Sequence, residues 1–247
     1  MKGLLSGMAD CLFPPLCLAC DVLLQDRPVL PLCKTCAAGI HRIVSPLCPI
    51  CGWPYPATVD GDHLCGDCLL TPPAFSCARS LGRYEGTLLD AIHVFKYGGN
   101  TNMGRLLGEI LAEAAYTGFQ PGDWTVLIPV PLHVRRLRER TFNQSVLLAR
   151  ALSGRFGIPV DVLSLKRRRD TTPQVALGRA ERRANIQGAF EVASPDRVAG
   201  QRVLLVDDVY TTGNTLNECA RVLLDGGAVA VAALTLARAL HGGPSHG

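Results

Sequence analysis

The stretch Val203-Leu-Leu-Val-Asp-Asp-Val-Tyr-Thr-Thr-Gly-Asn-Thr215 decides the fold of this chain. Its first four residues are apolar, as in a buried strand, and they come directly before two carboxylates. A loop of small, hydroxyl-bearing residues follows, and apolar side chains then repeat at helical spacing as far as Gly226-Gly227. The stretch therefore predicts a strand, a loop and a helix within a parallel α/β sheet flanked by helices.

The two carboxylates and the loop predict a site for a phosphorylated sugar. Ligands of parallel sheets bind at the carboxyl ends of the strands, so Asp207 and Asp208 should accept hydrogen bonds from adjacent sugar hydroxyls. The loop offers backbone N–H groups and hydroxyls at a helix N-terminus, where an anion is stabilised. An ordinary strand-turn-helix with solvent-facing acids is the alternative. The candidate residues for a 5′-phosphate are Thr211, Thr212, Gly213, Asn214 and Thr215.

Length and composition favour a folded protein with a sizeable core. The chain has 247 residues, of which 48% are hydrophobic, enough for one large domain or two modest ones. No apolar run reaches the roughly 18 residues that a membrane span needs, and the first ten residues have too short an apolar core for a secretory signal. We therefore expect a cytoplasmic protein without membrane insertion.

Eight of the eleven cysteines form four C-x-x-C pairs near the N-terminus, which is the spacing of metal sites. Two such pairs complete a tetrahedral Cys₄ site with no open position for water, so two structural Zn²⁺ ions are predicted. Pairing successive pairs gives spacers of 12 and 13 residues, whereas pairing the first with the third stays possible. Disulfides are disfavoured by the odd cysteine count. The predicted ligands are Cys17, Cys20, Cys33, Cys36, Cys48, Cys51, Cys65 and Cys68.

Residues 133–183 carry a concentrated positive charge. They hold 13 Lys/Arg and 4 Asp/Glu, a net charge of +9, whereas the rest of the chain carries −5. Such a segment suits a pyrophosphate, a nucleotide or a nucleic-acid backbone, and a solvated face without a partner is the alternative. Single-stranded DNA binding usually also needs stacking aromatic residues. Because only Phe142, Phe156 and Phe190 interleave with the arginines, the residues support it weakly.

Apolar periodicity predicts the elements between the cysteine-rich part and the C-terminus. The consecutive prolines of the segment that begins at Leu70 indicate a linker. Lys96, at the end of a helix, complements the helix dipole or contacts a phosphate. The long basic connection after residue 165 has little core pattern, which is typical of lids. The predicted elements are helices over residues 91–99, 106–114 and 142–156 and strands over residues 125–132, 160–165 and 228–236.

The acid-pair loop resembles the phosphoribosyl-pyrophosphate (PRPP) loop of type I phosphoribosyltransferases, although Tyr210 stands where an aliphatic residue is usual. In that family a loop placed like the segment after residue 129 holds the pyrophosphate, and a flexible loop closes over PRPP. For the two arginines of the flexible loop, solvated charge is the alternative. The implied pyrophosphate-binding residues are Val130, Pro131, Leu132, Arg182 and Arg183.

A series of motifs follows one another over nearly the whole chain. The motifs are the two Cys₄ ribbons, Phe95-Lys-Tyr-Gly98, Pro129-Val-Pro-Leu-His133, Arg138-Glu-Arg-Thr-Phe-Asn-Gln144, Thr172-Pro-Gln174, Arg182-Arg-Ala-Asn185 and the acid-pair loop. Their order resembles the ComF competence-protein family. Thr141 departs from it, because a glycine is usual there and positive φ is then easily reached. The resemblance implies a double zinc ribbon over residues 10–70, a linker over 71–79, a phosphoribosyltransferase-like domain over 80–240 and a disordered tail over 241–247.

The resemblances imply two functions from different classes. In the first, the protein is a glycosyltransferase that moves phosphoribose from PRPP to a nitrogen nucleophile and releases pyrophosphate. Asp207 and Asp208 would be its catalytic residues, holding the ribose hydroxyls, and PRPP would carry most of the Mg²⁺ coordination. In the second, it is a DNA-uptake accessory protein that binds single-stranded DNA and competence machinery proteins and uses PRPP as a regulator. A zinc-ribbon adaptor with an inactive second domain is a third possibility. The sequence names no acceptor.

Overall fold

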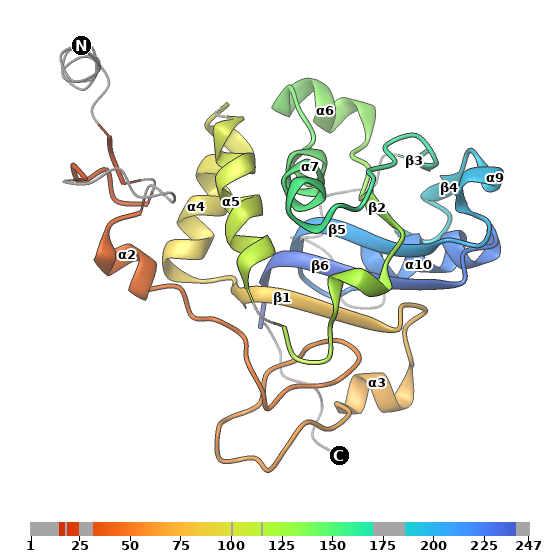
Figure 1. Cartoon of the computed structure of the whole chain (residues 1–247), viewed down its shortest axis with the longest axis horizontal. Helices are drawn as coiled ribbons and strands as arrows, with labels where there is room; N and C mark the ends of the chain where they lie inside the picture. The colour runs from red at the N-terminus through yellow and green to blue at the C-terminus, as the bar shows by residue number, and fades with distance from the viewer. Residues whose placement is uncertain are drawn as a thin grey trace.

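A four-stranded parallel sheet forms the centre of the molecule (Figure 1). Its order is β1-β6-β5-β2, and each neighbouring pair of strands runs parallel. The strands are β1 (Cys77–Arg83), β2 (Val126–Pro129), β5 (Arg202–Tyr210) and β6 (Ala230–Arg238). The structure is a computed structural model that describes residues 15–17, 19–24, 32–99, 101–114, 116–169 and 186–240.

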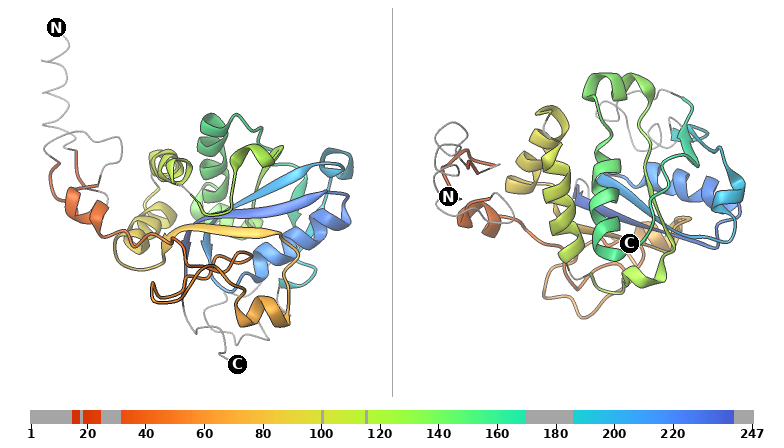
Figure 2. Two further views of the ribbon diagram at one scale, coloured as in Figure 1. Left: turned by 60° about the horizontal axis from the view of Figure 1, so that its bottom comes forward. Right: turned by 45° about the horizontal axis from the view of Figure 1, so that its top comes forward.

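Both faces of the sheet are covered, which explains the continuous apolar runs in its strands. On one face lie α4 (Gly86–Tyr97), α5 (Asn102–Glu113) and α7 (Gln144–Phe156). On the other lie α10 (Asn214–Asp225) and the second cysteine cluster, as the left view of Figure 2 shows. Alternate residues of β5 point to opposite faces of the sheet and belong to different apolar clusters. Leu204 and Val206 pack in the core with α4, α5 and α7, whereas Val203 and Leu205 pack with α10 and the cysteines.

Short elements complete the described chain. β3 and β4 pair antiparallel in a separate two-stranded sheet. The remaining elements are α2 (Lys34–Ala38), α3 (Gly66–Leu70), the 3₁₀ helix Pro121–Asp123, α6 (Val134–Arg140), β3 (Leu165–Arg167), β4 (Phe190–Val192) and α9 (Pro195–Val198).

The strand predicted over residues 160–165 is wrong. Val160 forms only a single parallel bridge with Leu127, and Leu165 already belongs to β3. The Asp161 carboxylate accepts hydrogen bonds from the backbone N–H groups of Leu163 and Ser164 at 2.8 and 3.0 Å. This local capping turns the chain and ends the extended conformation, because an aspartate side chain competes with a strand for backbone donors.

The linker predicted over residues 71–79 ends earlier than expected. Cys77 is the first residue of β1 and pairs with Ala232 of β6, so residues 77–79 belong to the sheet. The N–H of Ala74, within the linker, donates to the Asn217 side chain of α10 at 2.7 Å. The segment is therefore fixed against the domain that follows it.

A helix, α6, forms where the sequence predicts a loop between β2 and α7. His133 caps it by accepting a hydrogen bond from the Arg135 N–H at 3.4 Å. The helix ends at Thr141, whose φ is 65°, in the left-handed region that favours glycine. Thr141 therefore adopts the conformation that a glycine reaches easily, at the expense of backbone strain on a β-branched residue.

Candidate functional site

The acid pair lies at the carboxyl end of β5, beside the end of β2. Pro129 is opposite Val206 in the parallel register, so the chain leaves β2 next to the carboxylates. The Val130 N–H donates to the Val206 carbonyl oxygen at 2.9 Å and fixes the start of the turn over residues 130–132. The acids predicted to hold ribose and the turn predicted to hold pyrophosphate thus lie side by side.

The N-terminus of α7 holds both the turn and Asp207. The Ser145 hydroxyl donates to Asp207 Oδ1 at 3.0 Å. Asn143 donates through Nδ2 to the Val130 carbonyl oxygen at 3.0 Å and caps α7 by accepting from the Ser145 N–H. Sequence reasoning found the start of this helix but not its two contacts with the site, because they join segments far apart in the chain.

Lys96 contacts the acid pair directly. Its Nζ lies 3.0 Å from Asp208 Oδ2, and the two side chains are only 15% and 13% exposed. Lys96 lies in the last turn of α4, as its expected role beside the helix dipole requires, and the ion pair with Asp208 is a further contact that the sequence did not predict. Because the pair is largely shielded from water, its attraction is weakly screened and holds the end of α4 against β5.

The surroundings of Asp207 change its pKa. Burial raises the pKa of Asp207 to about 7, and the neighbouring Asp208 charge acts in the same direction. Hydrogen bonds from the Asp208 N–H and Ser145, and the charge of Lys96, act in the opposite direction. Near neutral pH Asp207 is therefore present both as a carboxylate and as a protonated carboxyl group. The acid pair can accept hydrogen bonds from vicinal hydroxyls, and the protonated form of Asp207 can also donate one.

The loop over residues 211–215, here called the threonine loop, joins β5 to the N-terminus of α10, and its shape depends on Gly213. This residue is the N-cap of α10 with φ of 77°. A Cβ atom there would overlap the ring and hydroxyl of Tyr210. Glycine is therefore required twice, for its backbone conformation and for the close approach of Tyr210.

Two polar atoms at the start of α10 are buried and have no partner among the residues that the structure describes. Thr212 Oγ1 and Asn214 Nδ2 make no hydrogen bond within the described residues. Buried donors are almost always satisfied in native proteins, so unpaired ones indicate a missing partner. Because both flank the N-terminus of a twelve-residue helix, an anion is the partner that this geometry favours.

The first part of the chain brings its cysteines together in two groups of four. Within each group all four sulfur atoms lie within 4.8 Å of one another. Cys20 Sγ lies 3.8 Å from Cys33 Sγ, and Cys51 Sγ lies 3.6 Å from Cys65 Sγ. A tetrahedron with Zn–S bonds of about 2.3 Å has edges of about 3.8 Å, so both groups fit zinc. Successive pairing is confirmed, and pairing the first knuckle with the third is excluded. The groups are Cys17, Cys20, Cys33 and Cys36, and Cys48, Cys51, Cys65 and Cys68.

Among the described residues, the other cysteines and the histidines near these clusters take no part in them. Cys77 lies in β1 and Cys219 is buried in α10, both outside the two groups. His41 pairs with Glu85 at 2.7 Å, and the ring of His63 stacks on Tyr55 with centroids 3.9 Å apart. Both histidines are thus accounted for without a metal.

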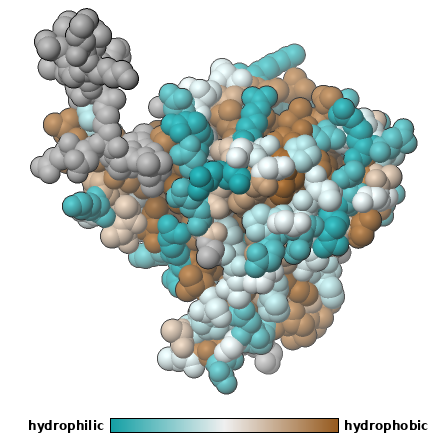
Figure 3. Space-filling view, in the orientation of Figure 1, coloured by the Kyte–Doolittle hydropathy of each residue, from teal (hydrophilic) through white to brown (hydrophobic). Residues whose placement is uncertain are grey.

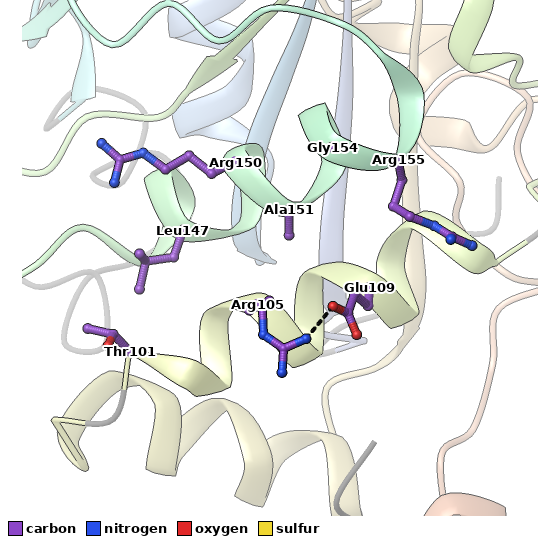
Figure 4. A pocket seen from close by; sticks show the side chains of 8 residues that line it. All are labelled: Thr101, Arg105, Glu109, Leu147, Arg150, Ala151, Gly154 and Arg155. Carbon is purple, nitrogen blue, oxygen red and sulfur yellow. Dashed lines mark hydrogen bonds and ion pairs between the residues drawn. The ribbon is translucent and has the colours of Figure 1, made fainter. Parts of the chain in front are cut away.

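A pocket of about 440 Å³ lies between α5 and α7 (Figure 4). Leu147 and Arg150 of α7 line it opposite Arg105 and Glu109 of α5, which pair at 2.5 Å. None of the predicted site residues belongs to it. Of those residues, Arg182 and Arg183 lie outside the described residues, as do residues 10–14 of the predicted ribbon and the tail over 241–247.

Comparison with known protein families divides the chain in two. Residues 8–69 match the double zinc ribbon domain, and residues 143–245 match the phosphoribosyl transferase domain. Within the described residues, no helix is long and apolar enough to span a membrane.

Three relatives match most of the chain. The DNA utilization protein YhgH of Salmonella typhimurium is 35% identical, and the match covers 85% of this chain and 91% of that protein. Competence protein F of Haemophilus influenzae is 32% identical, with 84% and 96% covered. Competence protein ComFC of Bacillus subtilis is 27% identical, with 90% and 95% covered.

Proposed function

The chain belongs to the family of competence protein F and the DNA utilization protein YhgH, and we propose that it binds PRPP and transfers the phosphoribosyl group. The transfer would go to a nitrogen nucleophile and release pyrophosphate. One observation carries the proposal: a carboxylate pair near the carboxyl end of β5 is followed by a loop whose buried donors, Thr212 Oγ1 and Asn214 Nδ2, have no partner among the described residues. Sugar hydroxyls suit the carboxylates, and a 5′-phosphate suits the donors.

The residues around the acid pair support positioning and electrostatic stabilisation. Asp207 and Asp208 would accept hydrogen bonds from the 2′- and 3′-hydroxyls of ribose, with Ser145 and Lys96 fixing their orientation. Positive charge develops on the ribose as pyrophosphate leaves, and the nearby carboxylates would stabilise it. The turn over residues 130–132 would hold the leaving group through its backbone.

Mg²⁺ would reach the site with PRPP. Asp208 is already neutralised by Lys96 at 3.0 Å, and Asp207 exchanges a proton near neutral pH. The acid pair is therefore poorly suited to hold a cation by itself, and most ligands of the ion would be pyrophosphate oxygens. When bound, the ion would reduce the negative charge that accumulates on the leaving group.

Calorimetric titration of the zinc-loaded protein with PRPP and Mg²⁺ tests this proposal. We expect the double variant Asp207→Asn, Asp208→Asn to lose PRPP affinity by at least about a hundredfold, because two acceptors of ribose hydroxyls are removed. A matched control is Asp196→Asn with Asp225→Asn, which removes two exposed carboxylates elsewhere. Equal PRPP affinity in the two double variants would contradict the site.

Turnover is tested separately from binding. Pyrophosphate release is followed with PRPP, Mg²⁺ and a panel of nitrogen nucleophiles that includes the nucleobases, ammonia and amines. The transferase proposal expects release that depends on one nucleophile and disappears in the Asp207→Asn, Asp208→Asn variant. Binding of PRPP without release for any nucleophile would instead favour PRPP as a regulatory ligand.

A second candidate function is the binding of single-stranded DNA during DNA uptake, which the names of the relatives suggest. Figure 3 shows hydrophilic side chains along the upper edge of the molecule, where α6 lies in Figure 1. Arg140 of α6 lies 5.4 Å above the ring of Tyr97, which is 65% exposed. An exposed aromatic ring beside basic residues is the combination that single strands require, and the sequence did not reveal it.

Fluorescence anisotropy with a labelled single-stranded oligonucleotide at several salt concentrations tests this candidate. We expect Tyr97→Ala to weaken binding by about tenfold, since stacking of a base contributes roughly 1–3 kcal/mol. Tyr55→Ala is the control, because that ring stacks on His63 within the zinc ribbon. Undetectable binding at low salt, or equal affinity of the two variants, would rule out this surface.

A further inference from the structure

The last residue of β6, Arg238, is a buried cation whose partner is the second cysteine cluster. Arg238 is only 5% exposed, and no carboxylate of the described residues lies within 4.0 Å of its guanidinium. Its Nη1 donates to the Cys51 carbonyl oxygen at 2.5 Å, and its Nη2 lies 3.6 Å from Cys51 Sγ. A buried charge is costly unless it is paired, and four thiolates around Zn²⁺ carry a net charge of −2. The cluster therefore supplies the countercharge.

The same guanidinium packs against the residue that ends β5. Its central carbon lies 3.9 Å from the centroid of the Tyr210 ring and 5.3 Å from the centroid of the Trp53 ring. Trp53 follows the third C-x-x-C knuckle, Cys48/Cys51, whereas Tyr210 precedes the loop over residues 211–215. Arg238 thus lies between an aromatic residue of the ribbon and one of the candidate PRPP site, where cation–π attraction is strengthened by burial.

Tyr210 in turn determines the position of the threonine loop. Its side chain is 6% exposed and contacts Gly213 so closely that a Cβ atom there could not be accommodated. Phe75 supports the ring from the edge, at 6.4 Å between centroids. A continuous series of contacts therefore runs from Cys51 through Arg238 and Tyr210 to Gly213, the N-cap of α10.

We propose that Arg238 and Tyr210 are positioning residues through which the second zinc site fixes the threonine loop in its ligand-binding conformation. The proposal rests on the proposed function only for the identity of the ligand. With zinc bound, the thiolate charge holds Arg238, Arg238 holds the Tyr210 ring, and the ring holds Gly213. Because coupling between sites is reciprocal, PRPP should also bind more tightly to the protein whose second site is occupied.

Hydrogen exchange followed by mass spectrometry tests the coupling without any ligand. In the zinc-loaded protein, we expect Arg238→Met to raise the exchange rate of the loop over residues 211–215 by at least about tenfold, with both zinc ions retained. The control is Arg202→Met, because Arg202 also lies over an aromatic ring, Trp124, at 5.4 Å but is at the opposite end of β5. Unchanged loop exchange in Arg238→Met would overturn the proposal.

Tyr210→Leu removes the aromatic partner of the same Arg238–Tyr210 contact, and it replaces Arg238→Met in this test if that variant does not fold. It should speed up loop exchange and leave two zinc ions bound per chain. Wild-type exchange in this variant would equally overturn the proposal.

Calorimetry then connects the loop with the ligand. Arg238→Met should weaken PRPP binding by about tenfold, within the usual range of coupling between sites, and Arg202→Met should not. If the wild-type protein binds no PRPP while loop exchange still responds to Arg238, the proposed function fails and the coupling stands. If PRPP binds normally to Arg238→Met and loop exchange is unchanged, the coupling fails and the proposed function stands.

Discussion

The two cysteine clusters share a motif but differ in what surrounds them. In the first cluster Cys17 is buried and Cys20 is exposed, and within the part of the chain that the structure describes the buried residues of the associated apolar core are Cys17, Leu24 and Leu32. In the second, all four cysteines are at most 5% exposed and belong to the core under the sheet, together with Val203 and Leu205 of β5. In Figure 1 the segment that carries the first cluster includes α2 and lies beside α4, and the segment that carries the second cluster lies beneath β1.

This difference shows that the spacing of the cysteines determines which ion is bound, whereas the residues packed around the cluster determine what the ion stabilises. Four cysteines at nearly the same spacing fit the same ion in both places. What the ion stabilises depends on the residues packed around it. At the first cluster it orders a small ribbon, whereas at the second it becomes part of the core of the phosphoribosyltransferase-like domain and the countercharge of Arg238.

The largest expected effect comes from removing one ligand in each cluster. Cys48→Ser should lower the free energy of unfolding of the α/β domain by at least about 4 kcal/mol, because loss of a structural metal from a core is among the most destabilising changes. Cys17→Ser should change it by less than about 0.5 kcal/mol. Chemical denaturation followed by circular dichroism, which reports mainly α4, α5, α7 and α10, measures both. Equal losses would mean that the two clusters play the same role.

A smaller difference should appear in the rates of metal loss. We expect a chromophoric chelator to remove zinc from the native protein in two phases that differ at least tenfold in rate. The fast phase belongs to the first cluster, where Cys20 is exposed, and the slow phase to the buried second cluster. In Cys17→Ser, Cys20→Ser only the slow phase should remain. A single phase in the native protein would contradict the distinction.

The parts of this molecule that could be predicted from its sequence depend on neighbouring residues in the chain. C-x-x-C knuckles and the acid-pair loop are local, so the zinc ligands and the β5–α10 connection could be identified directly. Asp161 shows the limit, because its own side chain ends the strand expected over residues 160–165. The contacts of Lys96 with Asp208 and of Arg238 with Cys51 join distant segments, and no local pattern indicates such pairings.

The smallest effect concerns pH and connects the acid pair with the second cluster. The pKa of Asp207 is raised to about 7, so the folded protein keeps a proton that the unfolded chain loses at a lower pH. Between the ordinary carboxyl range and about pH 7, ionisation of Asp207 in the unfolded chain therefore lowers the free energy of unfolding as the pH rises. Over that interval Asp207→Asn should gain stability relative to the native protein by roughly 1 kcal/mol per pH unit.

Denaturation of both proteins between pH 5 and pH 8, with zinc release recorded in parallel, measures this gain. Asp161→Asn is the control. Burial would raise the pKa of Asp161, but hydrogen bonds from Ser164 and Leu163 and the charge of Arg197 lower it. The stability that Asp161 contributes is present above its ordinary pKa and is lost only in acid, so its variant should show a constant deficit over this range.

Because β5 packs on the second cluster, the gain in Asp207→Asn should delay zinc release there and leave the first cluster unaffected. A gain that is independent of pH, or one shared by both clusters, would contradict the separation between them.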